Sequence, residues 1–436
     1  MIRRLLTSRL GVGGVARALD RSPGSVDPEI SRRVAEILAA VRDKGDAALI
    51  ELTQRFDGVS LAADELAVRP DELARAEREL PEATIRSLRY AADRIERFHR
   101  ECAPRSWRMQ DGNGSRLGQE VRPLGRVAVY VPGGRAAYPS TVLMTVIPAR
   151  VAGVKEIVLA SPPAPDKSLN AAVLAAARIA GVTEAYRVGG AQAIAALAYG
   201  TETIRRVDKI VGPGNVYVAL AKSRVFGDVG IDMVAGPSEV VVVADEHADA
   251  AFVAADLLAQ AEHDPMARSV LLTPSAALVE EVAAETERQL GGLARRDIAR
   301  SALEANGALV LTRSLEEAVD LANELAPEHL ELLVADPDAL LARVRNAGAV
   351  FLGRFTPEVV GDYVAGPNHV LPTAGTARFA SALGTEDFVK RLSVIEYSPE
   401  GLRQAAPHVA ELARVEGLQA HGAAALVRIT RMGGTG

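Results

Sequence analysis

The sequence predicts an α/β protein with two doubly wound parallel sheets, a short N-terminal arm and a helical C-terminal tail. Apolar, β-rich runs alternate with amphipathic helical stretches from residue 126 to residue 224, and the same rhythm returns from residue 231 to residue 352. Such alternation is typical of parallel sheets covered by helices. The length of 436 residues allows two or three domains.

The composition excludes several classes of protein. The chain is 48% hydrophobic and 24% charged, with a formal net charge of −6, as expected of a globular protein. Basic residues do not alternate with aromatic ones, so we expect no nucleic-acid partner. The single cysteine, Cys102, argues against a disulfide framework and a cysteine-rich zinc site. Because no long apolar run and no signal-peptide pattern occurs, we expect no membrane span and a cytoplasmic location.

The first 100 residues are predicted to form an arm followed by helices. Residues 1–25 show little patterning, and the glycines at positions 11, 13 and 14 lack the preceding strand and the spacing of a dinucleotide-binding loop. Residues 28–56 are predicted to be helical from apolar side chains spaced three and four apart, namely Ile30, Val34, Ile37, Leu38 and Val41. Residues 71–101 continue as helices with solvated faces.

The first predicted sheet has strands at residues 127–131, 156–160, 185–188 and 209–211, with helices at 140–152, 169–180, 191–199 and 216–224. Glycine-rich turns follow three of the strands, at Pro132-Gly133-Gly134, Gly189-Gly190 and Gly212-Pro213-Gly214. Open α/β sheets bind ligands beyond the carboxyl ends of their strands. The turns therefore indicate a nucleotide or phosphate site, although none matches a Walker A loop or a G-x-G-x-x-G fingerprint.

The second predicted sheet has strands at residues 240–244, 270–273, 308–312, 330–334 and 349–352, with helices at about 247–265, 276–290, 315–325 and 337–346. Residues 355–384 show no clear periodicity, which in a compact protein indicates either a functional loop or a wrong assignment. Residues 385–398 and 400–428 are predicted to be two helices.

We expect four segments from this pattern. They are an arm (residues 1–26), a split Rossmann-like α/β domain (27–129 with 240–383), a second Rossmann-like domain (130–239) and a helical tail (384–436).

A group of polar side chains suits a divalent metal. Gln260 and His263 are three residues apart and would share one face of a helix. Asp362 and His369 lie in the loop-rich stretch, where each could also be an ordinary turn residue. Nitrogen and oxygen ligands without a thiolate suit zinc or a similar metal with room for a substrate atom.

A second group suits acid–base chemistry. Glu328 and His329 are adjacent at the junction between a predicted helix and a strand. The alternative is a histidine that only stabilises a helix C-terminus. Taken alone, Ser238 is a turn residue or hydroxyl cap, and Glu416 and His421 lie on an exposed polar face.

Eight strings in order along nearly the whole chain resemble the histidinol dehydrogenase family. They are VYVPGG (129–134), VGGAQAIAAL (188–197), KIVGPGN (209–215), IDMVAGPSEV (231–240), QAEH (260–263), PEHL (327–330), GDY (361–363) and NHVLPT (368–373). The resemblance implies a zinc- and NAD-dependent oxidoreductase of histidine biosynthesis.

The resemblance also implies roles for individual residues. One Zn²⁺ per subunit would be held by Gln260, His263, Asp362 and His421. The same four side chains would surround the substrate together with Ser238, His329 and Glu416. Glu328 and His329 would be catalytic, and Tyr130, Gln192 and Asn215 would contact NAD from the domain of residues 130–239. The family forms a homodimer in which the C-terminal segment crosses over, so that Glu416 and His421 would complete the partner's site.

The implied reaction oxidises L-histidinol to L-histidine through bound L-histidinal, with two NAD⁺. One alternative is a paralogous dehydrogenase of another small alcohol, such as a sulfonated diol. Glu416 and His421, which would accept an imidazole and an amine, favour histidinol. Another alternative is a metal-dependent hydrolase with Glu328 as base. The glycine-rich edge and Tyr130 argue against it, because a hydrolase needs no second ligand site.

Overall fold

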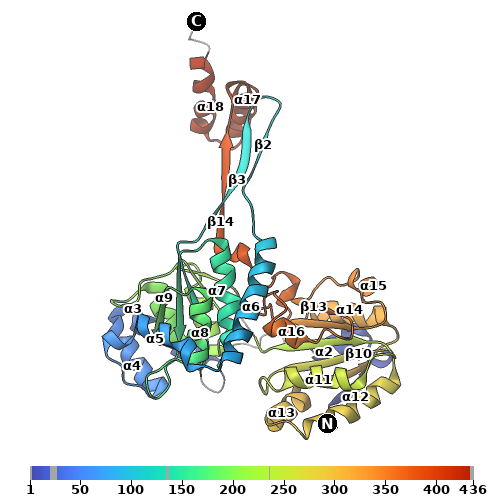
Figure 1. Cartoon of the computed structure of the whole chain (residues 1–436). Coiled ribbons are helices and arrows are strands. Elements are labelled where there is room, and N and C mark those ends of the chain that lie inside the picture. The colour runs from blue at the N-terminus through green and yellow to red at the C-terminus, as the bar shows by residue number, and fades with distance from the viewer. Residues whose placement is uncertain (1, 20–26, 134–136, 235, 433–436) are drawn as a thin grey trace. The chain divides into compact units, whose positions relative to one another are not determined.

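The computed structural model describes residues 2–19, 27–133, 137–234 and 236–432. The chain divides into two units, one of Met1–Cys102 with Gly125–Phe388 and one of Ala103–Leu124 with Val389–Gly436 (Figure 1). Gly134 of the first glycine-rich turn and residues 20–26 of the predicted arm lie outside the described residues. In the part of the chain described, no helix is long and apolar enough to cross a membrane.

A six-stranded parallel sheet in the first unit has the order β1-β11-β10-β9-β12-β13. Its strands are β1 (Arg3–Leu6), β9 (Glu239–Ala244), β10 (Arg268–Thr273), β11 (Ala308–Leu311), β12 (His329–Leu333) and β13 (Ala349–Leu352). The five strands from β9 to β13 confirm the prediction. Strand β1 corrects it, because Arg3–Leu6 pairs with β11 instead of belonging to an unpatterned arm. An edge strand of four residues is too short to show alternation.

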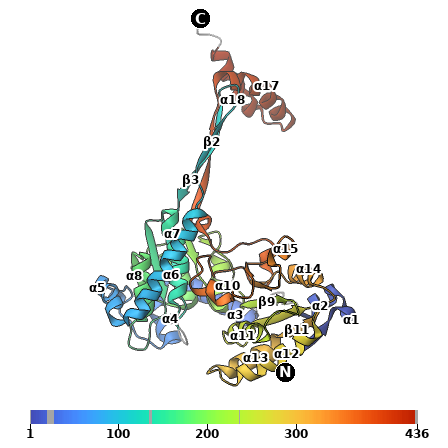
Figure 2. The same cartoon turned by 45° about the vertical axis from the view of Figure 1, so that its right-hand side comes forward.

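Helices cover both faces of this sheet (Figure 2). One face packs on α11 (Ala250–Ala261) and α12 (Ala276–Leu290), and the other on α2 (Val12–Leu19) and α14 (Leu315–Leu325). Burial on both faces explains the continuous apolar run of β9. The structure adds α13 (Arg296–Asn306) and α16 (Glu358–Tyr363), and shortens the predicted helix 337–346 to α15 (Pro337–Leu341).

A five-stranded parallel sheet in the same unit has the order β6-β5-β4-β7-β8. Its strands are β4 (Arg126–Tyr130), β5 (Glu156–Ser161), β6 (Glu184–Arg187), β7 (Lys209–Val211) and β8 (Gly230–Ile231). The predicted helices appear as α7 (Pro139–Ala152), α8 (Ala171–Ala180), α9 (Gly190–Tyr199) and α10 (Val216–Val225). Only β8, a two-residue strand, was not predicted.

The N-terminal helices pack on the five-stranded sheet. They are α3 (Pro28–Lys44), α4 (Asp46–Asp57), α5 (Pro70–Arg75) and α6 (Glu82–Glu101). Val34 and Leu49 share a core with Ala128 and Tyr130. The expected grouping of residues 27–129 with residues 240–383 therefore differs from the observed packing. Apolar periodicity shows which face of a helix is buried but does not name its partner.

The second unit combines an antiparallel sheet, in the order β14-β3-β2, with two helices. Its strands are β2 (Trp107–Gln110), β3 (Arg116–Pro123) and β14 (Val389–Glu396), and its helices are α17 (Pro399–Val415) and α18 (Gln419–Met432). The predicted helix at 385–398 was wrong over β14, which pairs with β3 along its whole length. The predicted helix at 400–428 is interrupted at Gly417, whose φ of 72° does not continue a right-handed helix.

The burial of His99 on α6 makes the free energy of unfolding depend on pH. Both of its ring nitrogens are buried without a hydrogen-bond partner among the described residues, and burial lowers its pKa to about 4. In the unfolded chain the His99 imidazole binds a proton near pH 6.5, whereas in the folded protein it stays neutral until about pH 4. The free energy of unfolding should thus fall by up to about 1.4 kcal/mol per pH unit between pH 6.5 and pH 4.

Thermal unfolding of a His99→Leu variant between pH 8 and pH 5 checks this expectation. The variant should lose less stability on acidification than the parent protein. His247→Leu is the matched control, because the His247 side chain is 75% exposed. Equal pH dependence of the His99→Leu variant and the parent would contradict the assignment.

Candidate functional site

Strand β12 of the six-stranded sheet begins at the candidate catalytic residue His329, and its neighbour β9 begins at Glu239. β12 starts at His329, and in the parallel register His329 lies opposite Val240 of β9. Helix α14 ends at Leu325 and is capped by Ala326, which has a left-handed backbone (φ 47°, ψ 61°), and Pro327 follows. This turn brings Glu328 and His329 to the amino ends of the strands.

His329 is held as a neutral base. Its Nδ1–H donates a hydrogen bond to the carbonyl oxygen of Glu239 at 3.1 Å, and its Nε2 lies 3.8 Å from Asp362 Oδ1. Because a carbonyl oxygen only accepts, the proton sits on Nδ1 and the lone pair on Nε2. Burial lowers the pKa of His329 despite the nearby Asp362 carboxylate. A neutral imidazole with a free Nε2 lone pair can accept a proton.

Glu328 is buried beside His329. Its Oε2 accepts a hydrogen bond from the Glu239 N–H at 2.9 Å and lies 3.8 Å from His329 Nδ1. Burial raises the pKa of Glu328 well above its usual range, and the negative charges of Glu239 and Asp362 add to this effect. The Glu239 N–H and the Ser238 side chain oppose the rise by donating hydrogen bonds to the carboxylate. A carboxylate with a raised pKa is a better general base when ionised.

The predicted metal ligands of the first unit lie around this pair. Gln260 is fully buried in the last turn of α11, and its Oε1 has no hydrogen-bond partner among the described residues. His263 lies two residues beyond the end of α11, which corrects its predicted place on the helix. Its Nδ1 is nevertheless 3.5 Å from Gln260 Nε2, and its charge would influence the pKa of His329. Asp362 comes from α16.

These residues fit a metal ion by their chemistry. An orphaned amide oxygen, an exposed imidazole and a carboxylate are hard or borderline donors that suit zinc. Within the described residues, no three histidine, cysteine or acidic side chains gather closely enough to hold a metal by themselves. The predicted set differs because it includes the amide oxygen of Gln260.

The loop-rich stretch connects the site to the five-stranded sheet. His369 Nδ1–H donates to the Asp362 carbonyl oxygen at 2.8 Å, and its Nε2 lies 3.3 Å from Thr141 Oγ1 on α7. Asn368 Nδ2 donates to the Met144 carbonyl oxygen at 2.5 Å. Through these contacts the loop connects the six-stranded sheet region to α7 of the five-stranded sheet. They give His369 a structural role, which the sequence pattern did not indicate.

Sequence reasoning missed the acidic side chains behind His329. Glu358 Oε2 lies 3.8 Å from His329 Nδ1, and burial raises the pKa of Glu358 well above its usual range. Glu331 and Asp256 lie next to it, with a hydrogen bond between their carboxyl groups. The four-residue spacing of Glu358 and Asp362 was the one available signal, because it places both on one face of α16.

The predicted NAD contacts occupy the carboxyl edge of the five-stranded sheet. Tyr130 ends β4, and its hydroxyl oxygen accepts a hydrogen bond from the Gly190 N–H at 3.0 Å. Gln192 is buried in the first turn of α9. Asn215 caps α10 and accepts hydrogen bonds from the next turn. Their places agree with the expected position of a ligand in an open sheet.

Buried charges hold the third glycine-rich turn at this edge. Gly212 N–H donates to Asp232 Oδ2 at 2.7 Å, and Lys222 Nζ donates to the Gly212 carbonyl oxygen at 2.8 Å. Lys222 and Asp232 also form an ion pair with side chains 2% and 1% exposed. The turn is thereby fixed beside Tyr130.

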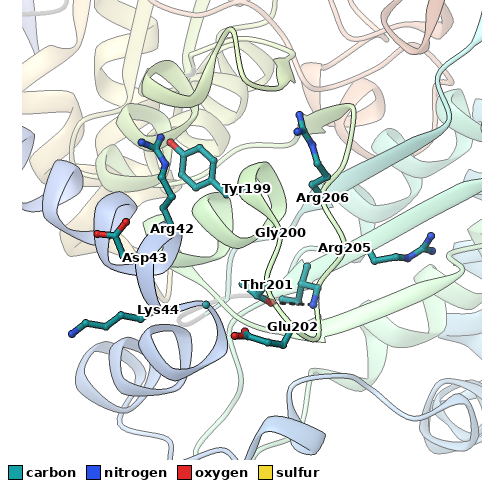
Figure 3. A pocket seen from close by; sticks show the side chains of 11 residues that line it. Arg42, Asp43, Lys44, Tyr199, Gly200, Thr201, Glu202, Arg205 and Arg206 are labelled. Atoms are coloured by element: carbon teal, nitrogen blue, oxygen red, sulfur yellow. Dashed lines mark hydrogen bonds between the residues drawn. The ribbon is translucent and has the colours of Figure 1, made fainter.

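A pocket of about 810 Å³ lies where α3 and α9 end (Figure 3). Its basic lining residues are Arg42, Lys44, Arg205 and Arg206. The Arg42 guanidinium lies 4.1 Å from the centre of the Tyr199 ring, and Arg205 pairs with Glu156 and Glu184. The pocket contains no predicted site residue.

Glu416 and His421 belong to the second unit. Glu416 is the C-cap that follows α17, and His421 lies in the first turn of α18, with Gly417 between them. Both side chains are exposed. Their expected part in the site stays a prediction.

Known proteins resemble this chain along almost its full length. The family model for histidinol dehydrogenase matches residues 20–429. The histidinol dehydrogenase of Geobacillus kaustophilus is 58% identical over 96% of this chain and 98% of the relative. That of Methylococcus capsulatus is 52% identical over 98% of each chain. The crystal structure of histidinol dehydrogenase from Elizabethkingia anophelis is 35% identical, with a TM-score of 0.94 over 99% of each chain.

Proposed function

The chain belongs to the histidinol dehydrogenase family of oxidoreductases, and we propose that it oxidises L-histidinol to L-histidine through bound L-histidinal, using NAD and zinc. The observation that carries the proposal is the pairing of a neutral His329 with a buried Glu328, next to Gln260, His263 and Asp362. One residue can take a proton from an alcohol, and the other can activate water.

The metal would be held by Gln260, His263 and Asp362 together with His421. Their nitrogen and oxygen atoms, and the unpartnered Gln260 Oε1, support this assignment. Bound zinc would serve to position the imidazole and amino nitrogens of the substrate. Ser238 and Glu416 would contribute further polar contacts to the substrate.

The dinucleotide would contact Tyr130, Gln192 and Asn215 at the carboxyl edge of the five-stranded sheet. When bound, NAD⁺ accepts a hydride in each of the two oxidations. His369 bridges Asp362 and α7, which supports a position of the hydride acceptor between the two sheets of this unit.

His329 would act in the first oxidation. Its Nε2 takes the hydroxyl proton of the substrate while the carbon loses hydride, and the Glu239 carbonyl oxygen stabilises the resulting imidazolium through Nδ1–H. Because burial lowers the pKa of His329, the imidazolium readily releases that proton afterwards.

Glu328 would act in the second oxidation. Its ionised carboxylate takes a proton from water as the water oxygen adds to the aldehyde carbon, and the hydrate then loses hydride to form the carboxylate product. Over both steps, one alcohol, one water and two NAD⁺ give one carboxylate, two NADH and three protons.

We further propose a homodimer in which Glu416 and His421 complete the partner's site. The second unit exposes many large apolar side chains, including Trp107, Met109, Ile395, Leu412, Val415 and Val427. Apolar surface of this extent typically marks a protein–protein interface. A second copy of the chain would cover it and would bring the fourth predicted metal ligand.

The activity is tested by mixing purified protein with NAD⁺ and L-histidinol and following NADH absorbance. Two NADH should form for each histidine. A chelator should abolish turnover, and added zinc should restore it. Full activity of metal-free protein would refute the role of zinc, and turnover only with another alcohol would select a paralogous dehydrogenase.

Glu328→Gln should slow the two oxidations unequally. The rate of L-histidinal oxidation should fall by about 10²–10⁴-fold, as expected for loss of a general base, while the rate of the first hydride transfer is less affected. Single-turnover kinetics started from the alcohol and from the aldehyde separate the steps. Glu324→Gln, at an exposed position of α14, is the matched control. Histidine formation at the parental rate would refute the role of Glu328.

The exchange of C-terminal segments is tested by complementation. Glu328→Gln and His421→Asn chains should each be nearly inactive, whereas their co-expression should restore up to about a quarter of the activity. About half of random dimers are mixed, and a mixed dimer would hold one fully intact site of two. If each chain supplies its own His421, no mixed dimer gains activity.

A further inference from the structure

Asp57, the last residue of α4, carries a carboxylate that the packing of the chain does not explain. Its Oδ2 is buried without a hydrogen-bond partner among the described residues. A negative charge at a helix C-terminus also opposes the helix dipole. Burial raises the pKa of Asp57 to about 6, which is the direction expected for a carboxylate in an unfavourable place.

Asp57 lies close to the edge that carries the predicted NAD contacts. Burial is the main cause of the raised pKa of Tyr130, about 12, and the Asp57 charge contributes to it. The Tyr130 hydroxyl group in turn contacts the Gly190 N–H at the start of α9. Val59, two residues after Asp57, shares an apolar core with Tyr130 and Ala191, so the end of α4 lies beside the region where β4 ends and α9 begins.

The two sides of the sheet indicate which part of a dinucleotide would meet Asp57. Tyr130 points to the face covered by α9 and α3, since it shares their apolar core. The other helix group, α6, α7 and α8, packs together, and α7 reaches His369 through Thr141. A dinucleotide with its nicotinamide on the α7 side would cross the edge and present its adenosine end to Asp57.

We propose that Asp57 accepts hydrogen bonds from the adenosine ribose hydroxyls and thereby selects NAD over NADP. The proposal rests on the NAD dependence proposed above. A carboxylate can accept from both hydroxyls of a vicinal diol, and it repels a phosphate at the 2′ position. The ribose would supply the hydrogen-bond donors that Oδ2 lacks.

The test compares the parent protein with Asp57→Asn by titration with NAD⁺ and with NADP⁺, and by thermal unfolding without ligand. The variant should bind NAD⁺ about tenfold more weakly, because it loses charge-assisted hydrogen bonds. Its preference for NAD⁺ over NADP⁺ should fall by at least about tenfold. Its unfolding temperature at pH 8 should rise, because a buried charge without a partner is removed.

Asp43→Asn is the matched control, since Asp43 is an exposed acid in the last turn of α3. It should leave both affinities unchanged. Equal affinity of the parent protein for NAD⁺ and NADP⁺ would overturn the inference without any variant. Unchanged NAD⁺ affinity and selectivity in Asp57→Asn would overturn it as well. In either case, turnover of L-histidinol by the parent protein would leave the proposed function standing, whereas failure of the parent to bind NAD⁺ would overturn both.

Discussion

The main chain of Glu239 is the constraint on which the candidate site depends. Its N–H donates to Glu328, and its carbonyl oxygen accepts from His329, so one residue orients both groups. The parallel pairing of β9 with β12 creates this arrangement, because it sets His329 opposite Val240. The Glu239 side chain forms a buried ion pair with Arg268, which ties the start of β9 to β10. The tautomer of His329 follows from strand register.

In the first unit, the candidate residues lie at the amino ends of the strands in one sheet and at the carboxyl ends of the strands in the other. The acid–base pair and the predicted metal ligands lie where β9 and β12 begin, whereas the glycine-rich turns lie where β4, β6 and β7 end. The loop containing His369 spans the two regions. The proposed reaction, in which hydride would move from a metal-positioned substrate to a dinucleotide, would bring these two regions together. Burying the acidic side chains near His329 costs desolvation free energy, which apolar side chains at the same positions would avoid.

Most strands and helices of the first unit could be predicted because buried parallel strands are continuous apolar runs and amphipathic helices follow them. The failures have physical causes. β1 is a short edge strand, and β14 is a strand only because β3 pairs with it. The helices of residues 28–101 were assigned to the other sheet, since periodicity does not reveal which surface an apolar face will meet.

The sequence by itself determined the α/β class, the family and the chemical identity of the candidate residues, because these are properties of residue types and their order. Tertiary structure alone decided that His329 is neutral with its proton on Nδ1, that Glu328 has a raised pKa, and that the Glu358 carboxyl group lies 3.8 Å from His329 Nδ1. Protonation and orientation depend on burial and on main-chain partners about 90 residues away in the chain, which no local pattern of side chains encodes.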